Sequence, residues 1–134
     1  MLEVSLELAS EFPVSNNNWP SDISFYINDI YVGTWTVPGN FSDVRAKLTP
    51  SWWPRQNSQY GLFRTLRITP YETLIDGEPI SSVNLSQIDF DKPLTKITFA
   101  IEKDAENVGG LTIFGKQFGN YPQDIEYKLS YSEE

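Results

Sequence analysis

Hydrophobic and polar residues alternate along several short stretches of this chain. In the first stretch every second residue is apolar, at Leu2, Val4, Leu6 and Leu8. Such a period of two predicts a half-buried β-strand whose polar residues face water. The same pattern predicts further strands over residues 23–27, 30–37, 61–69, 95–102, 111–114 and 124–131. No long helical period appears between them.

Turn-forming residues separate the predicted strands. Asn28-Asp29 tolerates positive φ and predicts a two-residue hairpin turn between residues 23–27 and 30–37. Asp76-Gly77 predicts a second hairpin within residues 72–80. Longer connections rich in Asn, Ser, Gly or Pro are expected over residues 11–22, 38–57 and 115–123. Residues 81–88 are predicted to form a helical turn or an irregular link.

Many short strands with turns between them indicate an all-β antiparallel two-sheet sandwich. The long excursions between strands favour a jelly-roll-like arrangement over a simple meander, and an up-and-down barrel is the alternative. With 134 residues and no visible boundary, a single domain is expected.

Composition excludes several kinds of chemistry. The chain has neither cysteine nor histidine, which rules out disulfides, Ser-His-Asp catalysis within the chain and ordinary zinc sites. Its net charge of −8 argues against nucleic-acid binding by this domain alone. There is no apolar run of membrane-spanning length and no signal peptide, so we expect a cytoplasmic protein without membrane contact. No cofactor is expected.

Basic and aromatic residues gather in residues 33–67. This stretch holds all four arginines, three of the four tryptophans and only one acidic residue, Asp43. Its net charge is +4, while the remainder of the chain carries −12. Basic groups beside flat aromatic faces are suited to holding a polar or anionic small molecule.

Trp52 and Trp53 stand between two prolines in the long loop. In such a loop one ring can pack inward while the other remains free to stack on a ligand. The competing interpretation is that the rings only anchor the loop on the core. Arg45, Lys47, Arg55 and Arg64 could converge on an anion, or could instead pair with surface acids. Arg64 is the strongest candidate because its strand face is otherwise apolar.

Other chemical signals are weak. The spacing of Asn28, Asp29, Asp22 and Asp43 matches no calcium loop. Gly115-Lys116 lacks the Ser or Thr that a phosphate-binding loop requires. Carboxylate pairs could hydrolyse a glycosidic bond, but no spacing selects a pair. We therefore expect no enzyme, and a glycosidase-like activity is the third hypothesis.

Several blocks together resemble one family. They are ISFYINDIYVGTW, PGNFSDVRAKLTPSWWP, QYGLFRTLRI and GGLTIFGKQFGNYPQDI. These blocks resemble the C-terminal β-rich domain of predicted ArsR-like bacterial transcriptional regulators. The resemblance implies an effector-sensing or dimerising half, whose N-terminal winged helix-turn-helix is missing here. DNA would be contacted only through that missing domain. The resemblance supplies no site residues.

The leading hypothesis is a non-catalytic sensor domain that binds a small polar effector, carbohydrate-like or anionic, such as a sugar or sugar acid. The predicted ligand-binding residues lie in the long loop, in the strand that follows it and in the 115–123 loop. They are Trp52, Trp53, Arg45, Tyr60, Arg64, Asn120 and Tyr121. The alternatives are a dimerisation domain, in which the same aromatics meet a second copy, or a carbohydrate-binding module without a regulatory role.

Overall fold

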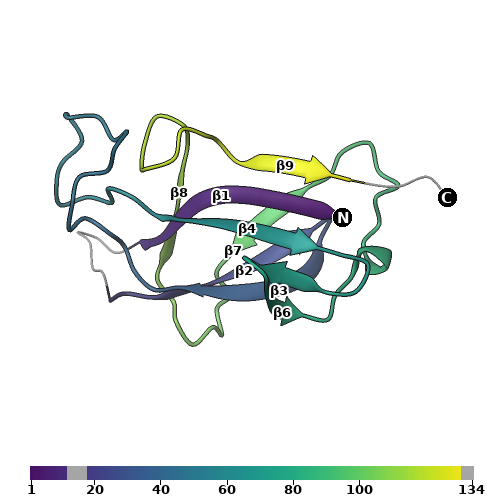
Figure 1. Ribbon diagram of the computed structural model, residues 1–134. Coiled ribbons are helices and arrows are strands. Elements are labelled where there is room, and N and C mark those ends of the chain that lie inside the picture. Colours follow the sequence, from purple (N-terminus) through teal and green to yellow (C-terminus); the bar gives the residue numbers. More distant parts are fainter. Residues whose placement is uncertain (12–17, 131–134) are drawn as a thin grey trace.

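The computed structural model describes residues 1–11 and 18–130 and shows a two-layer β-sandwich (Figure 1). The larger sheet contains β1 (Leu2–Glu11), β4 (Leu62–Ile68), β5 (Thr73–Ile75), β6 (Glu78–Ser81), β8 (Gly110–Phe114) and β9 (Glu126–Leu129). The smaller sheet contains β2 (Ser21–Ile27), β3 (Ile30–Val37) and β7 (Ile97–Ala100). A short 3-10 turn, η1, covers Leu85–Gln87.

β1 is the centre of the larger sheet, whose strand order is β6-β5-β4-β1-β8. All of its neighbours are antiparallel. β4 follows one edge of β1, while β8 and β9 share the other edge, β8 near Glu11 and β9 near Leu2. The chain crosses between the two sheets several times, so residues distant in sequence become neighbours. This excludes the up-and-down barrel and confirms the predicted antiparallel sandwich.

The core lies between the two sheets. On β1, Leu2, Val4, Leu6 and Leu8 point inward and are fully or almost fully buried. On β2, the inward residues are Ile23, Phe25 and Ile27. Because side chains alternate across a strand, the remaining residues of β2 face the opposite side of the smaller sheet. That side is open to solvent, and it carries the candidate site described below.

Both predicted hairpins are confirmed. Asn28 and Asp29 have φ values of 48° and 67° between β2 and β3. Asp76 and Gly77 have φ values of 46° and 87° between β5 and β6. Two consecutive residues with positive φ match the twist of the flanking strands. The predicted helical turn in residues 81–88 is η1, which Asn84 and Gln87 cap reciprocally.

Two expectations need correction. The alternating pattern predicts that Glu7 faces water, but it is only 1% exposed because the loops after β3 and β8 cover it. The last strand is short, and Ile125, Tyr127 and Leu129 remain exposed. β9 lies at the edge of the larger sheet, where its side chains stay in contact with solvent. Tyr131 and part of the predicted 11–22 loop lie outside the described residues.

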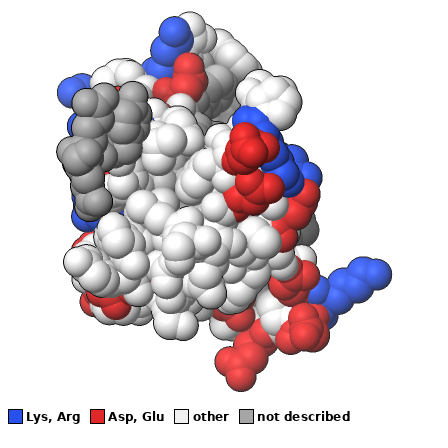
Figure 2. Space-filling view, turned by 90° about the vertical axis from the view of Figure 1, so that its right-hand side faces the viewer, with Lys and Arg blue, Asp and Glu red and all other residues white. Residues whose placement is uncertain are grey.

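The two ends of the sandwich differ in character. The connection after β3, residues 38–61 (hereafter the 38–61 loop), lies at the end opposite Met1 (Figure 1). Figure 2 faces the end that carries the N-terminus and shows a broad uncharged area with acidic and basic side chains along one side. Within the described part of the chain, no helix has the length and apolar character needed to cross a membrane.

Candidate functional site

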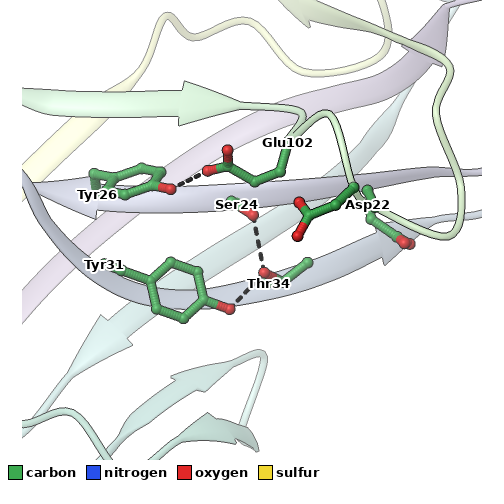
Figure 3. A pocket seen from close by; sticks show the side chains of 8 residues that line it. Asp22, Ser24, Tyr26, Tyr31, Thr34 and Glu102 are labelled. Atoms are coloured by element: carbon green, nitrogen blue, oxygen red, sulfur yellow. Dashed lines mark hydrogen bonds between the residues drawn. The ribbon is translucent and has the colours of Figure 1, made fainter.

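A polar groove lies on the open face of the smaller sheet (Figure 3). Its volume is about 440 Å³. It is lined by residues of β2, of β3 and of the segment after β7, which are Asp22, Ser24, Tyr26, Tyr31, Thr34, Glu102, Asp104 and Ala105. We call this site the sheet groove. It gathers aromatic rings, hydroxyls and carboxylates from three segments of the chain.

Strand periodicity and hairpin register bring these residues together. Asp22, Ser24 and Tyr26 alternate on β2 with the buried core residues. Across the hairpin, Ser24 pairs with Thr34 and Tyr26 pairs with Tyr31. The register shifts between Phe25 and Tyr26, and this irregularity brings Tyr31 opposite Tyr26. The local sequence of one hairpin therefore builds most of the groove.

The polar side chains form hydrogen-bonded groups (Figure 3). The hydroxyls of Tyr31 and Thr34 share a hydrogen bond of 2.6 Å, and those of Ser24 and Thr34 share one of 2.9 Å. The Tyr26 hydroxyl donates to the Glu102 carboxylate. These contacts hold the side chains in place before any ligand arrives, which lowers the entropic cost of binding.

The two tyrosine rings provide the aromatic surface of the groove. The ring centroids of Tyr26 and Tyr31 are 5.7 Å apart, and their planes meet at 64°. The Tyr31 side chain is 46% exposed, so its ring is accessible. A tyrosine combines an apolar face with a polar hydroxyl. The pair can therefore contact a flat, partly apolar ligand and hydrogen-bond to its edge.

The carboxylates make the groove electronegative. Partial burial of Asp22 tends to raise its pKa, but hydrogen bonds from Thr36 and Asn107 outweigh this and hold the pKa below its ordinary value. The hydrogen bond to Glu102 is the main cause of the raised pKa of Tyr26. No Lys or Arg is among the residues that line the groove. A neutral or cationic ligand is thus favoured over an anion.

Trp52 and Trp53, both predicted as ligand-binding residues, lie in the 38–61 loop. One of the two rings packs inward and the other is exposed. Trp53 packs inward, and its Nε1 donates to the Ser58 carbonyl at 2.9 Å. Trp52 is 71% exposed. Each tryptophan ring meets the ring of Phe118 edge-on, with centroids 6.0 Å away for Trp52 and 5.5 Å for Trp53.

Arg45 and Tyr60 stabilise the same loop internally. The Arg45 guanidinium donates to the carbonyls of Pro50 and Trp53, at 2.9 and 3.1 Å. The Tyr60 hydroxyl donates to Asp43 at 2.7 Å, and its ring stacks on Phe41. Burial, together with the hydrogen bond to Asp43, raises the pKa of Tyr60 to about 12. These polar groups therefore form hydrogen bonds within the loop and stabilise its conformation.

Asn120 and Tyr121 are tied to Glu7. The backbone N–H groups of both residues donate to the Glu7 carboxylate at 3.0 and 3.2 Å, and Gly61 donates at 2.8 Å. The Asn120 side chain accepts a hydrogen bond from the Lys47 backbone. The Tyr121 ring lies 4.7 Å from the Phe63 ring. Glu7 therefore fastens the two loops to the sheet.

Arg64 stands on β4 and contacts residues of β3 and of the turn between β5 and β6. Its guanidinium stacks over the Trp35 ring at 5.2 Å and contacts Asp76 at 3.3 Å. Arg67 contacts Glu3 at 3.2 Å. The guanidinium groups of Arg45 and Arg64 thus make separate contacts and do not meet at one anion site. Arg64 and Trp53 line different pockets, and neither of these two pockets includes another of the seven predicted ligand residues.

The sequence predicts strands for Ser24, Tyr26, Tyr31, Thr34 and Glu102 and a loop for Asp22, and none of these is among the predicted ligand-binding residues. The available signal was the polar set on the outer face of the 23–37 hairpin, where Ser24, Tyr26, Tyr31 and Thr34 all stand. The contributions of Glu102 and Asp104 could not be seen, because they follow a strand more than sixty residues away. Among the described residues, no group of three or more Asp and Glu side chains is placed to hold a metal ion.

Comparisons with protein-family models, with curated proteins and with solved structures give no match for this chain. The resemblance to ArsR-like regulators therefore stays a prediction.

Proposed function

We propose that the protein binds a small neutral polyhydroxylated ligand, such as a carbohydrate unit, in the sheet groove. The observation that carries this proposal is the convergence of two tyrosine rings with hydroxyl and carboxylate groups on one open groove of about 440 Å³. A sugar ring has an apolar face that can lie against an aromatic side chain, and hydroxyls that donate to carboxylates.

The groove chemistry supports a neutral ligand over an anionic one. Glu102 and Asp104 would repel a carboxylate or phosphate, and no cation lines the groove to offset them. The hydroxyls of Ser24, Tyr31 and Thr34 can both donate and accept. A sugar hydroxyl can do the same. This complementarity favours the carbohydrate part of the sequence-based expectation over the sugar-acid part.

We also propose that binding occurs without catalysis. The chain lacks histidine and cysteine. In the groove, Glu102 accepts from Tyr26, and Asp22 accepts from Thr36 and Asn107. The hydrogen bonds to Asp22 favour its ionised form, which suits a hydrogen-bond acceptor better than a general acid.

A role in regulation extends the proposal. If the chain is the sensing part of a bacterial cytoplasmic regulator, the ligand must bind one conformation better than another. The hairpin β2–β3 would then report occupancy of the sheet groove. DNA binding would belong to a separate domain.

Thermal-shift and calorimetric measurements with defined probes test the ligand class. Neutral mono- and disaccharides are expected to raise the melting temperature, because a ligand that binds only the folded state stabilises it. Glucuronate should bind more weakly than glucose. No stabilisation by any neutral sugar, or stabilisation by the diamine putrescine alone, would contradict the proposal.

A pair of tyrosine variants localises the site. Tyr31→Ala removes an accessible ring of the groove and should weaken sugar binding roughly tenfold, which corresponds to about 1.4 kcal/mol. Tyr71→Ala is the matched control, because Tyr71 is 84% exposed and does not line the groove. Equal affinity in the two variants would show that the sugar binds elsewhere.

A further inference from the structure

A second pocket lies beneath the 38–61 loop. It is lined by Trp53 and Ser58 of that loop, by Phe118, and by Thr112, Ile113, Phe114 and Gly115 at the end of β8. Its volume is about 170 Å³. We call it the loop pocket. It shares no lining residue with the sheet groove, so the two sites are independent.

Contacts within the protein hold the walls of the loop pocket in place before any ligand binds. Trp53 is held through its indole N–H, which donates to Ser58, and through its carbonyl, which accepts from Arg45. Phe118 meets the Trp53 ring edge-on at 5.5 Å. Phe114 is almost completely buried. A pocket with immobilised walls binds with less loss of entropy than one that must form around its ligand.

Size and lining define what the loop pocket can accept. A cavity of about 150 Å³ lined by apolar side chains holds one benzene ring. The loop pocket has a similar volume, and most of its lining is apolar. One aromatic ring is therefore a suitable occupant. Trp52, exposed and in edge contact with Trp53 and Phe118, adds aromatic surface next to this pocket.

The charge around the loop pocket differs from that of the whole protein. The 38–61 loop carries three basic residues and one acidic residue, within a chain of net charge −8. Arg55 and Lys116 are exposed, and neither forms an ion pair with a described carboxylate. The nearby Asp124 accepts the Lys116 backbone N–H at 3.1 Å. Arg55 and Lys116 follow the pocket-lining residues Trp53 and Gly115 closely in the sequence, and two exposed cations there favour an anionic head group.

We propose that the loop pocket binds the ring of a small aromatic carboxylic acid, with its carboxylate directed toward Arg55 and Lys116. This proposal does not rest on carbohydrate binding in the sheet groove. In this proposal the exposed ring of Trp52 covers part of the bound ligand.

Titration with phenylacetate, followed by NMR, tests this proposal. The indole N–H signal of Trp53 should shift on binding, because that group belongs to a wall of the loop pocket. Phenylacetate should bind roughly two- to fivefold more tightly than neutral phenylacetamide at low salt, as expected for one exposed charge contact. Acetate, which has no ring, should not shift the signal. Equal affinity for phenylacetate and phenylacetamide, or no shift of Trp53, would overturn the proposal.

Two charge variants locate the binding. Ile113→Glu adds a negative charge at the loop pocket and should weaken phenylacetate binding roughly fivefold. Ile113 is 37% exposed, so the change is compatible with folding. Ile30→Glu adds the same charge at an isoleucine that is also 37% exposed but does not line the loop pocket, and should leave the affinity unchanged. Equal effects of the two variants would place phenylacetate outside this pocket.

Discussion

At the scale of single residues, Glu7 shows that tertiary contacts can bury a residue that the alternating pattern places on a solvent-exposed strand face. Its carboxylate is buried on the outer face of β1 and accepts the backbone N–H groups of Gly61, Asn120 and Tyr121. Gly119 has a φ of 73°, and a Cβ added there would lie 2.4 Å from the carboxylate. Only a glycine allows the loop to approach so closely. Glu7 thus connects sheet and loops at one point.

Glu7→Gln should remove a pH-dependent component of stability. Desolvation is the main cause of the raised pKa of Glu7, although the three backbone hydrogen bonds oppose it. The folded state therefore retains the proton to higher pH than the unfolded state, whose carboxyl titrates near 4.5. The stabilisation is fully present below pH 4.5 and is lost as pH rises through the folded pKa. The wild-type advantage over Glu7→Gln should shrink across this window.

Urea denaturation at several pH values from 4 to roughly 7 measures this difference. Glu3→Gln provides the control, because Glu3 stands on the same strand face but contacts Arg67. An advantage of the wild type that grows with pH would contradict the predicted sign.

At the scale of elements, the two hairpins are determined locally. Asn28-Asp29 and Asp76-Gly77 adopt positive φ at both central residues, as these residue types allow. The strands on each side follow from alternation. The sequence also predicts a loop over residues 38–57, but it does not predict where the side chains of that loop point. Arg45 turns inward to satisfy two carbonyls, which depends on the folded path of the loop.

Gly77→Ala should destabilise the protein by about 1 kcal/mol. A Cβ at this position would meet nothing within 4 Å, so the cost arises from the φ of 87° alone. Gly77→Asn should cost less, because asparagine tolerates this conformation better than alanine. Chemical denaturation measures both variants. Alanine and asparagine variants of equal stability would show that the turn is not constrained in this way.

At the scale of the whole molecule, stability is expected to be concentrated in two strands. β1 and β2 are paired on both sides and carry much of the core. β9 lies at an edge and is exposed. Amide hydrogen exchange should therefore be slowest in β1 and β2 and faster in β9, because exchange follows local opening. Average protection in β9 equal to that in β1 would contradict this prediction.

Charge is also organised at this scale. The net charge of −8 is not spread evenly, since Figure 2 shows one broad uncharged area and the 38–61 loop is basic. The sheet groove is acidic, whereas the loop pocket has exposed cations near it. The two sites should therefore select ligands of different charge.

The sequence by itself determined the strands, the hairpin turns and the sandwich class, because alternation and positive-φ residues act within a few positions of each other. It also located an aromatic and basic loop. Only the tertiary structure decided that Glu7 is buried, that Arg64 lies on Trp35 and that Glu102 meets Tyr26. These contacts join residues from distant segments, and their existence depends on which strands pair and which faces the loops cover.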